Sequence, residues 1–274
     1  MTVTNAVETT MIWGTVSGAS MVGMVISLLL SVGLPIFLCI FIYKKTKAWV
    51  PAFFIGCGIF VGFAMILEQI CHAIVLTVTG DVIRDNIWLY AIYGGLAAAL
   101  FEECGRWIAM KFCLKKHLTR ENALMYGAGH GGIEAFLILG MSSMSNLLTA
   151  AMINGGLMEK TMTALEPAQQ EVTYHQLSVL WTTPAYQFYL APVERISAIA
   201  LQIALSILVY SAVKTGRKLQ LAAAFGLHFA VDFLTVICAS MIPTWALELG
   251  LLVVVAVICA AVYKLVYVHS AEKK

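Results

Sequence analysis

The sequence contains few charged residues. Of its 274 residues, 12% are charged and 61% are hydrophobic. A soluble domain carries about 25% charged residues, so this composition excludes an ordinary soluble protein. The formal net charge is +2, and the basic residues stand between apolar segments rather than in one patch. The sequence therefore predicts an integral membrane protein with the lipid bilayer, and not nucleic acid, as its surroundings.

Three other signals are missing. No CxxC pair occurs among the seven cysteines, which argues against a disulfide framework or a zinc knuckle. The first apolar run, residues 16–43, is too long for a signal peptide and has no basic region before it, so we expect a membrane helix there. No repeat, low-complexity segment or linker divides the chain. Residues 1–274 are therefore expected to form a single multi-pass membrane domain.

A membrane-spanning helix needs about 20 predominantly apolar residues. On this basis the sequence predicts an all-α, polytopic helical bundle of seven membrane helices, or eight if part of the longest loop also enters the bilayer. The predicted segments lie near residues 16–43, 51–78, 87–112, 121–141, 191–213, 218–240 and 244–268.

The basic residues alternate along the chain with these segments. Most of the 17 Lys and Arg residues fall within 44–47, 111–120, 214–218 and the tail 273–274. Loops rich in Lys and Arg face the cytoplasm. The N-terminus is therefore expected outside and the C-terminus in the cytoplasm.

One outer segment, residues 142–190, is much longer than the other connections. Its part 145–165 has an amphipathic helical pattern, and we expect it to be re-entrant or to continue the fourth membrane helix. Its part 169–181 is expected to form a short interfacial helix. Both a surface cap and a role in admitting substrate are open for this segment.

Three apolar segments carry ionisable residues one helical turn apart. A charged group at membrane depth costs a few kcal/mol or more and usually faces a polar interior. Residues at i and i+4 share one helix face, so each segment can direct its polar side chains to a common centre. The residues are Glu102, Glu103 and Arg106 on the third segment, His130 and Glu134 on the fourth, and His228 and Asp232 on the sixth.

These polar groups are expected at one depth. Counted from the basic ends of their segments at 1.5 Å per residue, Glu102, His130 and His228 lie roughly 13, 14 and 15 Å into the bilayer. Buried pairs that merely join helices have no reason to converge in one layer. The coincidence predicts a single site on the cytoplasmic side of the midplane.

Two hydrolytic schemes suit these residue types. In the first, a glutamate takes a proton from water, a histidine holds the water and another polar group stabilises the oxyanion. In the second, His130 and His228 bind zinc together with Glu134 or Asp232, and the remaining glutamate is the base. The sequence has no HExxH or other compact zinc signature, which favours the first scheme, with no required cofactor. Zinc stays open as the second mechanism.

The ordered motifs resemble a known group of membrane proteases. The order EExxR, then a histidine four residues after Tyr126, then HxxxD is similar to the CAAX-protease and bacteriocin-processing superfamily, which shows EExxxR, FxxxH and HxxxN/D on successive helices. The strings FEECGR and GHGGIE resemble more closely the YhfC-like membrane peptidase family. The motifs span Glu102 to Asp232, and the expected topology fits over most of the chain.

The resemblance implies a role for each motif residue. Glu102 is implied as the water-activating base, with Glu103 supporting it and paired to Arg106. His130 is implied as the residue that positions the water. The last motif, His228 and Asp232, falls at the oxyanion-stabilising positions.

Several departures from the superfamily pattern bear on the mechanism. The first motif has one residue fewer between glutamate and arginine, which leaves the base open between Glu102 and Glu103. Tyr126 replaces phenylalanine. An ionised Asp232 is a poor oxyanion donor and Glu134 is additional, and both features keep zinc in consideration.

The sequence thus predicts an intramembrane peptidase of the bacterial plasma membrane that cleaves a membrane protein or peptide. The competing class is a proton- or ion-coupled transporter, because intramembrane Glu and His residues also relay protons. The absence of an inverted repeat in the sequence argues against a transporter. A third hypothesis is a peptidase-like scaffold in which the polar residues only join helices. The sequence makes no prediction of the oligomeric state.

Overall fold

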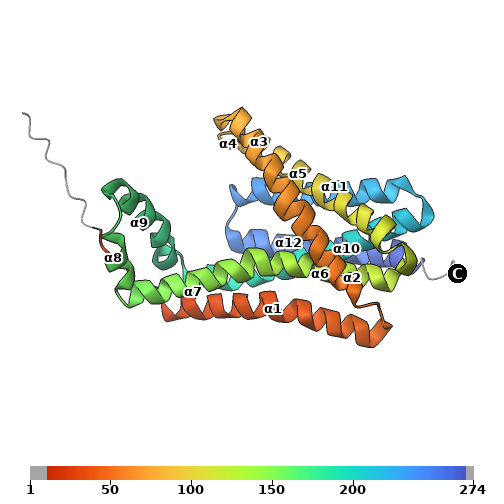
Figure 1. Ribbon diagram of the computed structural model, residues 1–274, viewed down its shortest axis with the longest axis horizontal. Coiled ribbons are helices and arrows are strands. Elements are labelled where there is room, and N and C mark those ends of the chain that lie inside the picture. Colours follow the sequence, from red (N-terminus) through yellow and green to blue (C-terminus); the bar gives the residue numbers. More distant parts are fainter. Residues whose placement is uncertain (1–10, 270–274) are drawn as a thin grey trace, which may run out of the picture.

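The computed structural model describes residues 11–269, and this part of the chain is built from helices without strands (Figure 1). Seven helical segments in it are long and apolar enough to cross a membrane. They are Gly18–Thr46, Pro51–Thr79, Ile87–Cys113, Arg120–Asn154, Ala185–Thr215, Lys218–Ala239 and Thr244–Tyr267. The predicted all-α membrane bundle is confirmed, with seven spans rather than eight in the described range.

Four of these spans contain a π-helical stretch, a form that widens the helix locally. The first span is α1 (Gly18–Thr46). The second consists of α2 (Pro51–Phe60), η1 (Val61–Glu68) and α3 (Gln69–Thr79), and the third of α5 (Ile87–Ile108) and η2 (Ala109–Cys113). The short helix α4 (Asp81–Arg84) precedes the third span, and η3 (Lys115–His117) follows it. The fourth span comprises α6, η4 and α7 (Arg120–Ala135, Phe136–Gly140, Met141–Asn154), and the last three are α10 (Ala185–Thr215), α11 (Lys218–Ala239) and α12 with η5 (Thr244–Val262, Tyr263–Tyr267). The remaining helices are α8 (Leu157–Met162) and α9 (Pro167–Thr182).

Local sequence signals fix several helix ends. The side chain of Asn86 accepts hydrogen bonds from the backbone N–H groups of Trp88 and Leu89 at the start of α5. Thr119 caps the start of α6 in the same way, through the N–H of Asn122. Such caps satisfy backbone donors that have no partner inside the helix. At the other end, α10 stops at Gly216, which adopts the left-handed conformation that favours glycine.

Helix α10 lies at the centre of the bundle. It packs against α1, α6, α11 and α12, and 72% of its membrane window is buried inside the protein, compared with at most 33% for any other span. Most residues of α6, at the start of the fourth span, are buried as well, whereas the other spans carry many exposed apolar side chains that suit contact with lipid. A polar side chain on α10 is thus placed in the protein interior.

Glycine allows α2 and α6 to approach closely. A Cβ atom added at Gly56 would lie 2.2 Å from the carbonyl oxygen of Tyr126, and one added at Gly129 would lie 1.9 Å from that of Phe53. Small residues permit such backbone contact between membrane helices. This contact fixes the part of α6 that carries His130.

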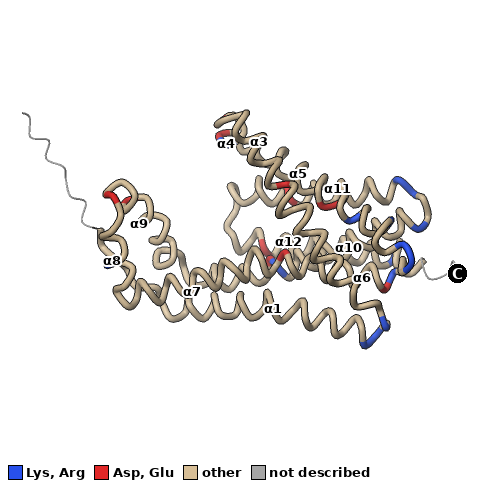
Figure 2. Tube along the Cα trace, in the orientation of Figure 1, with Lys and Arg blue, Asp and Glu red and all other residues tan. Residues whose placement is uncertain are grey.

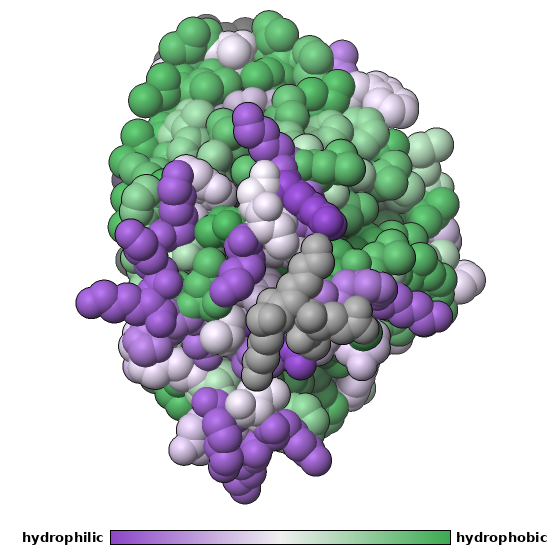
Figure 3. Space-filling view, turned by 90° about the vertical axis from the view of Figure 1, so that its right-hand side faces the viewer, coloured by the Kyte–Doolittle hydropathy of each residue, from purple (hydrophilic) through white to green (hydrophobic). Residues whose placement is uncertain are grey.

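The basic segments gather at one end of the molecule, on the right in Figure 2. Figure 3 views this end, where hydrophilic side chains extend between hydrophobic ones. The alternation seen in the sequence is therefore present in space. The assignment of this end to the cytoplasm stays a prediction.

The segment 142–190 forms the opposite end. Its first part, α7, continues the fourth span, which was one of the two predicted alternatives. Helix α9 includes residues 169–181, for which a short helix was predicted. Asn154, at the end of α7, exchanges two hydrogen bonds with the backbone of Val16, at 2.9 and 3.0 Å. The rings of Trp13, Tyr174 and Trp181 pack together beside this contact. The long segment is thus folded against the start of α1.

Candidate metal centre

The three polar motifs meet inside the bundle. Helix α5 contributes Glu102, Glu103 and Arg106, α6 contributes His130 and Glu134, and α11 contributes His228 and Asp232. All except Asp232 are buried, and the Asp232 side chain is 35% exposed. The three motifs therefore meet in one place, as the similar depths of Glu102, His130 and His228 predicted.

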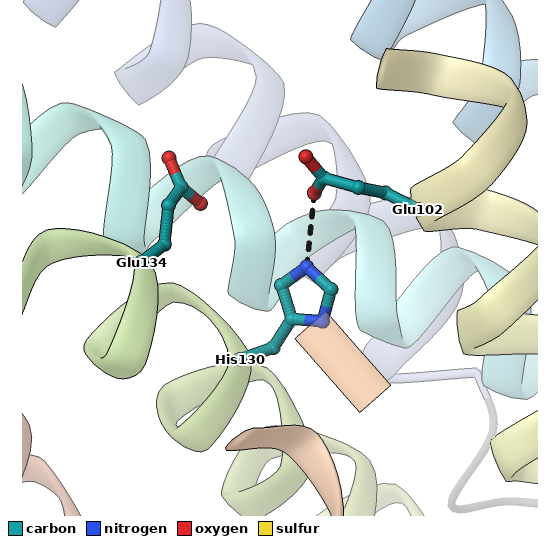
Figure 4. Close-up of side chains that lie close together, drawn as sticks. All are labelled: Glu102, His130 and Glu134. Atoms are coloured by element: carbon teal, nitrogen blue, oxygen red, sulfur yellow. Dashed lines mark hydrogen bonds and ion pairs between the residues drawn. The ribbon is translucent and has the colours of Figure 1, made fainter. Parts of the chain in front are cut away.

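The tightest group consists of Glu102, His130 and Glu134, which we call the Glu–His–Glu cluster. Nε2 of His130 lies 2.9 Å from Oε2 of Glu102, and each residue offers one ligand atom within 4.8 Å of the others. Figure 4 shows the three side chains extending from α5 and α6 toward a common space. The cluster includes Glu102, which the sequence analysis assigned as a base, and does not include His228.

Gln202 on α10 connects two members of this cluster. Its side-chain Nε2 donates to Oε2 of Glu102 and to Oε2 of Glu134, each at 2.9 Å. The residue is 3% exposed. Sequence analysis missed Gln202, because a single neutral residue in an apolar helix has no charged neighbour one turn away. Its position on the central helix is the structural signal that reveals it.

Arg106 is completely buried and connects the cluster to α10. Its guanidinium donates to the backbone carbonyl and the side-chain Oε1 of Gln202 and to the hydroxyl of Ser206. Its Nε lies 3.3 Å from Oε2 of Glu103, an ion pair without hydrogen-bond geometry. The pairing of Glu103 with Arg106 expected from the sequence is therefore present, and Arg106 also holds Gln202 in place.

His228 lies between two acidic residues. Its Nδ1 lies 2.8 Å from Oε1 of Glu103, and its Nε2 lies 3.5 Å from Oδ2 of Asp232. The same Nε2 lies 3.9 Å from Oε2 of Glu102. A carboxylate that accepts from one ring nitrogen leaves the other as an unprotonated acceptor or metal ligand. His228 therefore stands beside the Glu–His–Glu cluster with Nε2 directed toward it.

Arg195 on α10 forms an ion pair with Glu134 of the Glu–His–Glu cluster. Its guanidinium lies 3.2 Å from Oε1 of Glu134 and also bonds both carboxylate oxygens of Glu194. Glu194 and Arg195 are neighbours on α10 and form an ion pair with each other. The contact of Arg195 with Glu134 joins that pair to the cluster.

Glu68 and His72, one helical turn apart, form another polar pair near the cluster. Nε2 of His72 lies 3.2 Å from Oε1 of Glu68, and its Nδ1 lies 2.8 Å from the hydroxyl of Tyr93. His72 and Tyr93 line the same cavity as Glu102 and Glu134.

A cavity of about 490 Å³ lies between the Glu–His–Glu cluster and the His72–Tyr93 pair. Glu102, Glu134, His228 and Asp232 line one part of it, while apolar side chains from α10, α11 and α12 line another. A space of this size accommodates a short stretch of peptide, since ligand sites in proteins occupy about 300–1,000 Å³. The polar groups thus face a space that a substrate can enter.

The donor set of the cluster fits zinc. Imidazole nitrogen and carboxylate oxygen are zinc ligands, and catalytic zinc sites use three protein ligands with one open position. Glu102, His130 and Glu134 supply that number of donors, within 4.8 Å of one another and beside a cavity. Gln202 bonds both carboxylates, as groups around metal ligands commonly do.

Comparison with known proteins identifies the family. A family model described as "YhfC intramembrane metalloprotease" matches residues 30–259. The chain belongs to the YhfC family. It is 43% identical over 204 residues to the uncharacterized membrane protein YhfC of Bacillus subtilis (strain 168), which covers 71% of this chain and 76% of that protein. No solved structure matches the chain.

Membership of the YhfC family confirms the resemblance seen in the motifs FEECGR and GHGGIE. The matched range contains every residue of the three motifs. The seven apolar helices and the YhfC relative also confirm a bacterial multi-pass membrane protein. The family's description as a metalloprotease does not support the expectation that no cofactor is required.

Proposed function

We propose that this chain is an intramembrane peptidase in which Glu102, His130 and Glu134 hold a zinc ion. The observation that carries the proposal is the approach of one imidazole and two carboxylates within 4.8 Å of one another inside the spans. The description of the family as an intramembrane metalloprotease supports it. When bound, zinc polarises a carbonyl and lowers the pKa of a bound water toward neutrality.

The chain's own residues organise the reacting groups. Gln202 holds Glu102 and Glu134 at a fixed separation through its two 2.9 Å hydrogen bonds. Arg106 in turn fixes the Gln202 side chain. Preorganised groups lower the barrier because they do not have to reorient during the reaction.

His228 and Asp232 are placed to act on the substrate. The Nε2 atom of His228 faces the cavity region near Glu102 while Glu103 fixes Nδ1, so the ring can donate a proton to an oxyanion or to the leaving amine once it is protonated. Asp232 is the most exposed carboxylate of the motifs and lies 3.5 Å from the same nitrogen. It can receive that proton or hold the ring in its charged form.

A metal-free mechanism is the second candidate, and one contact favours it. The direct 2.9 Å bond between Glu102 and His130 lets Glu102 take a proton from water while His130 orients that water. This scheme corresponds to the CAAX-protease and bacteriocin-processing superfamily, in which we place the chain on the order of its motifs. Both mechanisms use the same residues and the same cavity.

The substrate we propose is a membrane-associated protein or peptide. The cavity lies among the membrane spans and combines the polar groups with apolar side chains such as Leu201, Val231 and Leu251. Such a wall suits the apolar side chains of a segment that enters from the bilayer. Hydrolysis then requires water to reach the polar side of the cavity.

The decisive experiment measures metal and cleavage in the same preparation. The substrate is first identified by comparing the proteomes of membranes that contain the wild type or Glu102→Ala. Purified wild type is expected to contain about one zinc per chain, to lose cleavage with a chelator and to regain it with zinc. His130→Ala and Glu134→Ala should lose both zinc and cleavage, whereas the control Glu166→Ala, on the exposed start of α9, should keep both.

The outcomes separate the mechanisms. An active preparation without bound metal would reject zinc and leave the metal-free scheme. Cleavage retained by both Glu102→Ala and His130→Ala would reject the peptidase site itself.

A further inference from the structure

A second cavity lies at the basic end of the molecule, away from the Glu–His–Glu cluster. It measures about 240 Å³ and is enclosed by the end of α10, the start of α11 and η5. Six of its lining residues carry polar side chains that bear on the argument, namely Tyr210, Ser211, Lys214, Thr215, Arg217 and Gln220. We call this space the basic-end cavity.

The basic-end cavity has uncompensated positive charge. Lys214 and Arg217 line it, and no carboxylate does. Neither residue forms an ion pair within the described range 11–269. The nearest pair of opposite charges at this end, Arg120 with Glu121, is already closed at 2.8 Å. The cavity therefore attracts an anion.

Two hydroxyl groups at the cavity wall point to a ligand more specifically than the charges do. Tyr210 and Ser211 are each 4% exposed and line the cavity. Neither hydroxyl forms a hydrogen bond in the part of the chain that the structure describes, and neither oxygen is fully buried, so both are available to a ligand inside the cavity. A ligand with acceptor oxygens in this cavity would satisfy both hydroxyls.

The start of α11 adds further donors. Arg217 occupies the position before this 22-residue helix, and no side chain caps the first backbone N–H groups. Free N–H groups and the helix dipole favour phosphate at such an end. The helix end, the two hydroxyls and the two cations therefore belong to one cavity.

The surroundings of the cavity are apolar. Leu265 lines it and is 72% exposed, and Leu219, next to the start of α11, is 81% exposed. Both side chains lie near the ends of membrane spans, so their exposed apolar surface is available to the hydrocarbon part of a lipid. A ligand that fits both features carries a phosphate and a hydrocarbon part.

We propose that the basic-end cavity binds the phosphate group of an anionic phospholipid. The general preference for basic residues on one membrane face accounts for Lys214 and Arg217, but it accounts neither for a cavity nor for the two hydroxyls that line it. Basic pockets between membrane helices are suited to lipid headgroups. The bound lipid would join the ends of α10 and α11, the helices that carry Gln202 and His228. The proposal is independent of the peptidase reaction.

The test compares lipid retention by the purified full chain in detergent, measured by native mass spectrometry. The probes are short-chain phosphatidylglycerol, the zwitterionic phosphatidylcholine and inorganic phosphate. The variant Lys214→Ala/Arg217→Ala removes the cations of the cavity. The matched control Lys44→Ala/Lys45→Ala removes the same charge from α1 at the same end.

Wild type and control should bind phosphatidylglycerol alike and in preference to phosphatidylcholine. Binding should fall about fivefold for each cavity charge removed. Ser211→Ala and Tyr210→Phe, which keep the charge and nearly the shape, should also weaken binding, so the proposal can be tested even if the double variant fails to fold. Equal binding by the cavity variants and the control, or binding of inorganic phosphate without retention of phosphatidylglycerol, would overturn the proposal.

Discussion

The Nδ1 atom of His228 lies 2.8 Å from Oε1 of Glu103, although the two residues are 125 positions apart in the chain. This bond joins α11 to α5 and determines which nitrogen of the ring faces the cavity. Glu103 also forms an ion pair with Arg106. Its carboxylate is therefore engaged on both oxygens, which favours Glu102 over Glu103 as the zinc ligand of the proposed mechanism and as the base of the metal-free scheme.

Glu103→Ala is expected to lower the catalytic rate by ~10–100-fold, the usual effect of losing a carboxylate that orients a functional histidine. The bound zinc should be unchanged, because Glu103 is outside the Glu–His–Glu cluster. Glu103→Gln, whose amide oxygen can still accept from His228, should recover part of the rate. The rate and the zinc content of each purified variant check this. Loss of zinc together with activity would contradict the assignment.

Gln202→Leu is expected to weaken zinc binding by ~10–100-fold, because the hydrogen bonds that hold Glu102 and Glu134 are lost. A competition titration with a chromophoric chelator measures the affinity. The control is Gln176→Leu, the same change at an exposed position of α9. Unchanged zinc affinity in Gln202→Leu would show that the two carboxylates hold their positions without it.

Gly56→Ala is expected to destabilise the protein, whereas Gly58→Ala on the same helix should not. The added Cβ meets a carbonyl oxygen at 2.2 Å at position 56 and nothing within 4 Å at position 58. Overpacking of this kind costs ~1–3 kcal/mol, offset slightly by the better helix propensity of alanine. Thermal unfolding in detergent compares the two variants. Equal transition temperatures would show that α2 and α6 can move apart to admit the added methyl group without loss of stability.

The sequence predicted the spans and the motif residues for a clear physical reason. Hydrophobic runs of membrane length are long, strong signals, and an ionisable residue inside one is conspicuous. Glu102, His130 and His228 stood out in this way, and their similar depth followed from helix geometry alone. The structure places all three within one centre.

Contacts of neutral residues and contacts between distant helices could not be predicted in this way. Gln202 and Ser206 lie singly in an apolar segment, and only the central position of α10 brings them to Arg106. The composition of the candidate metal-binding group also depended on side-chain placement. For the zinc scheme, the sequence predicted that His130 and His228 would bind the metal together, whereas the structure groups His130 with Glu102 and Glu134.

The boundaries of the fourth span illustrate a different limit. We predicted residues 121–141 for the hydrophobic run and left open whether residues 145–165 re-enter the membrane or continue the fourth helix; the helix continues to Asn154. Polar residues after position 141 lower the hydropathy without breaking a helix, since Ser and Asn are tolerated in helix interiors at a modest cost. The helix ends at Gly155 and Gly156, the second of which adopts the left-handed conformation that favours glycine, and Asn154 beside them bonds to Val16, which is distant in sequence.

The buried Arg106 has a consequence for biogenesis. Its hydrogen-bond acceptors on α10 are synthesised almost a hundred residues later, so they are absent when α5 first enters the membrane. Insertion of one charged residue at the centre of a helix costs about 2.5–3.5 kcal/mol at the translocon. During that interval Glu102 and Glu103, one turn before Arg106 on the same helix, are its available counter-ions. The two carboxylates of the first motif thus accompany the arginine into the bilayer, and the arrival of α10 then supplies its hydrogen-bond acceptors while both ion pairs remain.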